Sequence, residues 1–213
     1  MSDFFTARVK MYDEHMLSEV EGCKEGYIKM ATLVPTHSER LLDLGCGTGL
    51  ELDEIFKLLP HIKVTGIDLT QAMLDELYRK HPDKDMQLIC ADYFQIPLGK
   101  NEFDCAVSFQ TMHHFSKDKK LELYKKIYES LKDGGIYIEC DYMVITQKEE
   151  DFWFSENDRI RKEQGVAVEE FYHYDTPCTV DNQMSLLREA GFISVEPVFR
   201  MENTTMLLAA KKR

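Results

Sequence analysis

The nine residues LLDLGCGTG, at positions 41–49, decide how the surrounding sequence folds. An apolar run ends at Leu44, three glycines alternate over the next five residues, and the amphipathic segment LELDEIFKLLP (50–60) follows. This order predicts a buried strand, a tight turn and a helix. Alternating glycines let the backbone turn sharply and approach a ligand closely. The turn by itself is weak evidence for any particular ligand.

The next strand-like runs end in residues that suit a nucleoside ligand. Asp68 ends one of them, 19 residues after Gly49, where an acid can bond ribose hydroxyls. Asp92 and Phe109 end the following two runs. Because the carboxyl ends of parallel strands meet at one edge, where open α/β sheets bind ligands, we expect these residues to surround a common site.

Strand-like runs alternate with amphipathic helices through most of the chain. We expect strands at 40–45, 62–68, 86–92, 103–109 and 135–143, and helices at 50–60, 70–82, 116–133 and 180–191. This alternation predicts right-handed βαβ units, and hence an α/β, doubly wound, mostly parallel sheet with helices on both faces. Thr70 is expected to cap its helix, and Gly134-Gly135 to end the helix 116–133. The last two runs, 193–200 and 204–212, are three residues apart, which predicts an antiparallel hairpin.

Two segments fall outside this alternation. Residues 1–35 have apolar positions at near-helical spacing and stop at Pro35, which predicts a helical N-terminal cap. Residues 144–178 are inserted after the fifth strand and are rich in aromatic residues, which suggests a lid that excludes water from a reactive site. The charge run KEEDF (148–152) within them is interpreted as a solvated helix start. At this length, 1–213 is expected to form a single domain.

Composition excludes several classes of function. The chain of 213 residues has 26 Lys+Arg against 38 Asp+Glu, a net charge of −12 that disfavours a nucleic-acid partner. No apolar run is long enough to span a membrane, and the first residues do not form a secretory signal, so a cytoplasmic protein is expected. The six cysteines are widely spaced and are interpreted as small buried hydrophobes. No metal-ligand spacing is present, so no metal site is predicted.

The spacing Gly-x-Gly-x-Gly differs from the Gly-x-Gly-x-x-Gly of dinucleotide sites, and Asp43 suits a cationic group better than a pyrophosphate. Here the sequence resembles the class I S-adenosylmethionine-dependent methyltransferases, near a small bacterial and archaeal branch with ubiquinone/menaquinone-type methyltransferases and carboxy-S-adenosylmethionine synthase-like proteins. The matching segments, over about residues 40–212, are LLDLGCGTG, GIDLT, CADYFQIP, FDCAVSFQTMHHF, LKDGGIYIECDY and EAGF. The resemblance implies a Rossmann-like sheet of seven strands with an antiparallel C-terminal strand. It also implies S-adenosyl-L-methionine as cofactor and S-adenosyl-L-homocysteine as product.

The resemblance assigns cofactor contacts residue by residue. Asp43 would orient the cofactor's ammonium, directly or through water, and Asp68 would bind both ribose hydroxyls. The methionine portion would further contact Gly45, Gly47, the backbone around Cys46, Tyr12, Phe109 and His114. The adenine would contact Leu69, Met73, Asp92 and Tyr93.

Methyl transfer is an in-line displacement at a carbon that the sulfonium already activates. The protein must align the nucleophile, exclude water and, for some acceptors, remove a proton. The catalytic candidates near the methyl group are His113, His114, Tyr142, His173 and Tyr174. Histidine leads as a base because it titrates near neutral pH. We expect a small-molecule acceptor and a monomer or homodimer.

Two other functions remain open. A carboxy-S-adenosylmethionine synthase-like enzyme would use the same cofactor site but would need an arginine near the methyl group to hold a carboxylate. Arg159, Arg161 and Arg200 are the candidates, and none follows a recognisable motif. A non-catalytic S-adenosylmethionine-binding module would have the fold without the reaction.

Overall fold

The computed structural model describes residues 2–166 and 174–213. The elements follow in the order α1 (Ser2–Ser18), α2 (Cys23–Leu33), β1 (Arg40–Leu44), α3 (Leu50–Leu58), β2 (Lys63–Asp68), α4 (Gln71–Lys80), β3 (Met86–Cys90), β4 (Phe103–Phe109), the 3-10 turn η1 (Met112–His114), α5 (Lys117–Ser130), β5 (Leu131–Tyr142), α6 (Gln147–Gln164), α7 (Val180–Glu189), β6 (Ser194–Met201) and β7 (Thr204–Ala210). The alternation of strands and helices predicted from the sequence is therefore confirmed.

All seven strands form one sheet in the order β3-β2-β1-β4-β5-β7-β6. Strand β1 lies at the switch point, where Leu41 pairs in parallel with Val64 of β2 on one side and Cys105 of β4 on the other. Strand β7 runs antiparallel to both β5 and β6, as the short C-terminal connection predicts. The doubly wound, mostly parallel seven-stranded sheet is confirmed.

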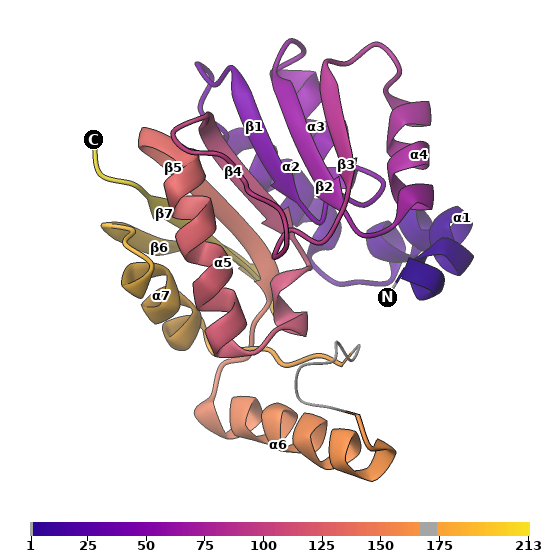
Figure 1. Cartoon of the computed structure of the whole chain (residues 1–213), viewed down its shortest axis with the longest axis vertical. Helices are drawn as coiled ribbons and strands as arrows, with labels where there is room; N and C mark the ends of the chain where they lie inside the picture. The colour runs from indigo at the N-terminus through magenta and orange to yellow at the C-terminus, as the bar shows by residue number, and fades with distance from the viewer. Residues whose placement is uncertain (1, 167–173) are drawn as a thin grey trace.

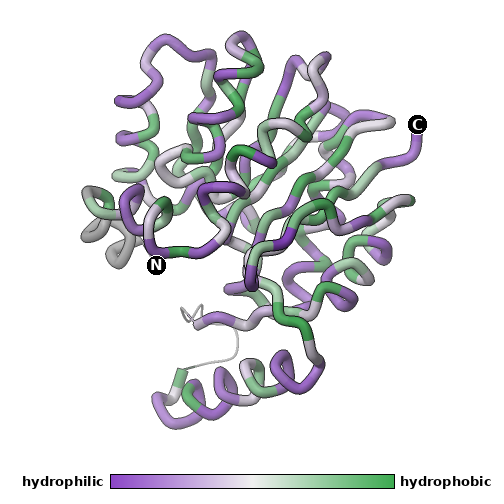
Figure 2. Tube along the Cα trace, turned by 180° about the vertical axis from the view of Figure 1, so that it is seen from behind, coloured by the Kyte–Doolittle hydropathy of each residue, from purple (hydrophilic) through white to green (hydrophobic). Residues whose placement is uncertain are grey.

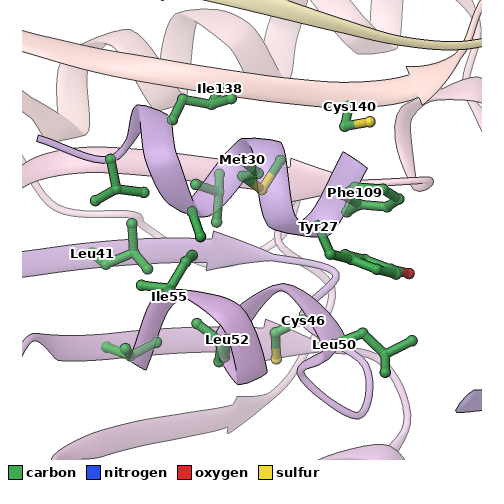
Figure 3. Packing of buried hydrophobic residues seen from close by; sticks show 14 of the residues in the cluster. Tyr27, Met30, Leu41, Cys46, Leu50, Leu52, Ile55, Phe109, Ile138 and Cys140 are labelled. Carbon is green, nitrogen blue, oxygen red and sulfur yellow. The ribbon is translucent and has the colours of Figure 1, made fainter. Parts of the chain in front are cut away.

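Helices cover both faces of the sheet because its central strands are apolar on both sides (Figure 1). On one face, α2 and α3 pack over side chains such as Leu41 and Ile138, and Figure 3 shows Met30 and Ile55 among them. On the other face, α5 and α7 cover side chains such as Leu42. Figure 2 shows hydrophobic residues concentrated along the strands. These two cores hold the strands in place, and the candidate site forms at the carboxyl ends of the strands.

Two local predictions were wrong. Helix α5 ends at Ser130, not at the glycine pair, because β5 already begins at Leu131 and a register shift separates its first pairing from the next. Gly134, with a φ of 74°, lies in that irregularity. Thr70 stands at the N-cap position of α4, but its hydroxyl makes no cap hydrogen bond. Both predictions rested on the local preferences of glycine and threonine at helix ends, and the surrounding fold overrode those preferences.

The two segments outside the alternation both contain helix. The N-terminal segment forms two helices, α1 and α2, separated at Gly22, which has a φ of 78°. Figure 1 shows α1 beside one end of α4, and α6 below the sheet on the side of β5. Among the described residues, none of the helices combines the length and the hydrophobicity needed to traverse a bilayer.

Candidate cofactor and acceptor site

The glycine turn after β1 is held by backbone hydrogen bonds to β2. Gly45 N and Cys46 N donate to the carbonyl of Ile67 at 2.8 and 3.2 Å, and Gly47 N donates to Asp68 Oδ2 at 3.1 Å. Gly45 has a φ of 74°, and a Cβ there would lie 2.8 Å from Thr111 Oγ1. Glycine is needed at this position for both its backbone conformation and its size.

Asp68 ends β2 beside this turn. Its Oδ1 accepts a hydrogen bond from Thr70 N at 2.8 Å, while its Oδ2 accepts the one from Gly47. Burial raises the pKa of the Asp68 carboxyl, and the backbone donors partly oppose that rise. A carboxylate held by two backbone N–H groups is fixed in position, and its remaining lone pairs can accept from hydroxyls.

A narrow cavity of about 60 Å³ lies over this carboxylate. Nine of the twelve residues predicted to contact a cofactor line it: Tyr12, Gly45, Gly47, Asp68, Leu69, Met73, Tyr93, Phe109 and His114. They come from six different parts of the chain. The sheet edge brings together residues that the sequence separates by up to about a hundred positions, as expected for an open α/β sheet.

The other three predicted cofactor residues lie elsewhere. Asp43 is fully buried beneath the turn and does not line the cavity; burial and the neighbouring Glu51 raise the pKa of its carboxyl well above the usual range. Burial also raises the pKa of Glu51 to about 8, so the two carboxyls are not both ionised at neutral pH. Cys46 points into the core. The Asp92 side chain accepts from Phe94 N at 2.8 Å and stays outside the lining.

Sequence reasoning did not assign the three other lining residues to a ligand site: Thr70, after β2, and Gln110 and Thr111, directly after β4. Gln110 has a φ of 50°, which is uncommon for a residue other than glycine, and its Nε2 donates to Thr204 Oγ1 at 3.3 Å. Thr111 Oγ1 lies 3.1 Å from the hydroxyl of Tyr93. The signal that could have found Gln110 and Thr111 is their position directly after a central strand, whose carboxyl end borders the cavity.

A larger cavity of about 1130 Å³ adjoins the narrow one. The two share Tyr12, Gln110 and His114. The larger cavity is walled by α1, by η1 and by the turn between β6 and β7. Its lining includes five carboxylates, Glu14, Glu19, Glu21, Asp175 and Glu202, and no lysine or arginine among the residues that the structure describes. Its electrostatic potential therefore favours cations.

Three of the five catalytic candidates line this cavity: His113, His114 and Tyr142. The ring of Tyr174 lies 6.2 Å from that of Trp153 on α6, and Tyr174 is not among the lining residues. His173 falls outside the described residues. The histidine pair and the end of β5 thus lie together at the carboxyl edge of the sheet.

His113 is the most firmly held of the candidates. Its Nδ1 lies 2.6 Å from Asp141 Oδ1, and its Nε2 lies 3.6 Å from Asp175 Oδ1. Burial alone would lower its pKa, but the charge and hydrogen bond of Asp141 outweigh that effect and raise the pKa of His113. The imidazole is therefore oriented by one carboxylate and presents its other nitrogen towards the cavity.

Comparison with known proteins identifies the fold. Residues 41–135 match a family model described as a methyltransferase domain. A human N-acetylserotonin methyltransferase, solved in complex with S-adenosylmethionine, superposes with a TM-score of 0.70 at 18% identity, covering 100% of this chain and 57% of its own. The S-adenosylmethionine-dependent methyltransferase SibL gives a TM-score of 0.69 at 19% identity, covering 95% of this chain and 57% of its own. This is the class I methyltransferase fold.

The resemblance to class I S-adenosylmethionine-dependent methyltransferases is confirmed, and S-adenosylmethionine is the cofactor of that class. The chain spans 57% of the length of these two solved structures. Among curated proteins, a carboxy-S-adenosyl-L-methionine synthase of Nitratiruptor sp. is 25% identical over 219 residues, covering 95% of this chain and 90% of that protein. The name of that relative is the name of the alternative activity that the sequence left open.

Proposed function

We propose that the protein transfers a methyl group from S-adenosylmethionine to a small-molecule acceptor held in the larger cavity. The adenosine of the cofactor would occupy the narrow cavity, with its ribose hydroxyls donating to Asp68 and its adenine against Leu69 and Met73. Phe109 and the glycine turn would border the methionine portion. The 213 residues would act as one methyltransferase domain, with 1–35 as a cap and 144–178 as a lid.

The observation that carries this proposal is the junction of the two cavities at Tyr12, Gln110 and His114. A cofactor bound along the sheet edge would place its sulfonium at that junction, so that the methyl carbon faces the larger cavity. Displacement there needs the acceptor's lone pair in line with the breaking C–S bond. Holding two reactants in such an arrangement can lower the barrier by about 7–11 kcal/mol.

The carboxy-S-adenosylmethionine synthase reaction is the second candidate, because curated relatives have that name. Its substrate carboxylate would need a cationic side chain at the methyl group. Arg159 and Arg161 lie on α6, where Arg159 pairs with glutamates of its own helix. Arg200 donates to the Met143 carbonyl, at 3.4 Å, and to Asn203. None of the three is among the described lining residues, which favours methyl transfer.

Calorimetry and mass spectrometry test the proposal together. We expect S-adenosylmethionine and S-adenosylhomocysteine to bind, and S-adenosylhomocysteine to accumulate with at least one acceptor from a panel of amines, thiols, phenols, quinols and carboxylates. A carboxylated cofactor in the product mixture would favour the second candidate. Tight cofactor binding with no turnover across the panel would favour a non-catalytic module. Absence of cofactor binding would refute all three.

A further inference from the structure

Three potential metal ligands converge at the wall of the larger cavity. His113 and His114 come from η1, and Asp175 comes from the segment that precedes α7. Asp175 Oδ1 lies 3.6 Å from His113 Nε2 and 3.4 Å from His114 Nδ1. Ligand atoms from all three residues lie within 4.8 Å of one another. They are the only such group of histidine, cysteine and acidic side chains found in the part of the chain that the structure describes.

Two of these separations match the edges of a tetrahedral metal site, and the convergence of the ligand atoms within 4.8 Å bounds the third. Zinc binds imidazole nitrogen and carboxylate oxygen at about 2.0–2.2 Å, which places neighbouring ligands of a tetrahedral site about 3.3–3.6 Å apart. The two measured edges, 3.4 and 3.6 Å, agree with that spacing. Two histidines and one carboxylate leave a fourth position open, as in catalytic sites, and here that position faces a cavity.

Asp141 and Thr176 hold the three potential ligands in position. Asp141 Oδ1 lies 2.6 Å from His113 Nδ1, so the carboxylate fixes the tautomer that leaves a lone pair on Nε2. A carboxylate in this role is typical of metal-bound histidines. Thr176 attaches the Asp175 segment to η1, because its N and its Oγ1 both donate to the His113 carbonyl, at 2.7 and 3.0 Å.

The surroundings also favour a cation. The cavity lining adds Glu14, Glu19, Glu21 and Glu202 to Asp175, and the described part of the lining contains no lysine or arginine to offset them. A bound divalent ion would reduce the repulsion among these carboxylates. The field of the cavity and the ligand geometry therefore act in the same direction.

We propose that His113, His114 and Asp175 bind a divalent transition metal of the Zn²⁺ type, with Asp141 positioning His113. The open coordination position would take an oxygen or nitrogen lone pair of the acceptor and hold it beside the cofactor's methyl group. Metal binding itself does not depend on the proposed methyl transfer, so the two can fail separately.

Titration of the full chain with Zn²⁺ and Co²⁺, after removal of any affinity tag and treatment with a chelator, tests this site. We expect one ion per chain by calorimetry, and visible d–d bands of Co²⁺ in a four- or five-coordinate nitrogen and oxygen site. Asp175→Asn and His113→Gln should abolish the bands. Asp141→Asn, which leaves every ligand in place, should weaken binding by about 10–100-fold.

Matched controls separate a built site from general attraction to acids. Glu14→Gln and Glu202→Gln each remove one carboxylate from the same cavity and should retain the Co²⁺ spectrum. S-adenosylmethionine binding, measured on every variant, reports whether the fold and the cofactor site are intact. The inference is overturned if the wild type binds neither ion, or if the Asp175 and His113 variants bind as tightly as the wild type.

Discussion

Replacing Glu150 with glutamine tests how the lid is attached to the sheet. Glu150 lies in the first turn of α6 and its side chain is only 1% exposed. Its Oε2 accepts from Thr179 N at 2.5 Å and from Asn182 Nδ2 at 2.8 Å, and Oε1 forms an ion pair with Lys117. This single carboxylate therefore connects α6 to the beginnings of both α5 and α7.

The size of the effect follows from the pKa of Glu150. Burial would raise it, but the Lys117 ion pair and the hydrogen bonds from Thr179 and Asn182 lower it from 4.5 to about 2. A shift of 4.5 − 2 = 2.5 units corresponds to an upper bound of about 3.4 kcal/mol. Because the Lys117 side chain is 41% exposed and its attraction is screened, we expect about 1–3 kcal/mol. This stabilisation is complete above pH 4.5, the unfolded value, and is lost as the pH falls towards 2.

Urea denaturation of the wild type and of Glu150→Gln, at neutral pH and near about pH 3, measures this term. The variant should be less stable by about 1–3 kcal/mol at neutral pH, and the difference should shrink at the acidic pH as the wild-type carboxylate protonates. Glu163→Gln, on the exposed side of the same helix, should cost at most about 1 kcal/mol. Attachment of the lid by charge is refuted if the wild type and Glu150→Gln have the same free energy of unfolding at neutral pH. It is also refuted if the difference between them is the same at both pH values, because the Glu150 charge would then not stabilise the contact with α5 and α7.

Three further predictions concern the cofactor edge. Asp68→Ala should weaken S-adenosylmethionine binding at least about tenfold, or 1.4 kcal/mol, in calorimetry, whereas the exposed Asp75→Ala should bind normally. Gly49→Ala should lower the free energy of unfolding in urea by more than Gly165→Ala does. Both glycines have a positive φ, which costs about 1–2 kcal/mol for alanine, but only a Cβ at Gly49 would meet a buried methyl group, that of Leu77, at 2.4 Å. Equal losses would contradict this clash. In the wild type, the pKa of Glu51 is raised from 4.5 in the unfolded chain to about 8 in the fold, so the free energy of unfolding falls as the pH rises through this range. Glu51→Gln removes the titrating group, so its free energy of unfolding should depend less on pH between about pH 5 and about pH 9.

The sheet and most residues that line the narrow cavity could be predicted because both depend on local patterns. Alternating apolar runs fixed the strands, and residues after a strand end must reach the same edge. Asp43 shows the limit of this reasoning. Its place before the first glycine predicts a role toward the cofactor's ammonium, directly or through water, whereas its complete burial beside Glu51 could not be predicted. Whether a strand-end carboxyl faces a ligand or the core depends on packing that sequence spacing does not encode.

The larger cavity was harder to predict because its walls come from distant parts of the chain. Glu14 and Glu19 on α1 and Glu202 in the β6–β7 turn were unremarkable as single acidic residues in the sequence. Glu150 belonged to a charge run that we interpreted as solvated, and the structure corrects this, because α5 and α7 enclose it. The convergence of His113, His114 and Asp175 could not be predicted either, since the histidines and Asp175 are about 60 positions apart and follow no known spacing.

The glycine turn is also attached to one wall of the larger cavity. Thr48, within the turn, donates to Asp13 Oδ1 of α1 at 2.5 Å, and Lys80 of α4 contacts both Asp13 Oδ2, at 3.3 Å, and the Thr48 carbonyl, at 3.1 Å. Helix α1 is thus attached to the turn that lines the narrow cavity, while its Tyr12 and Glu14 line the larger one. Thr48 and Asp13 therefore hold one wall of the larger cavity against the turn that lines the narrow one.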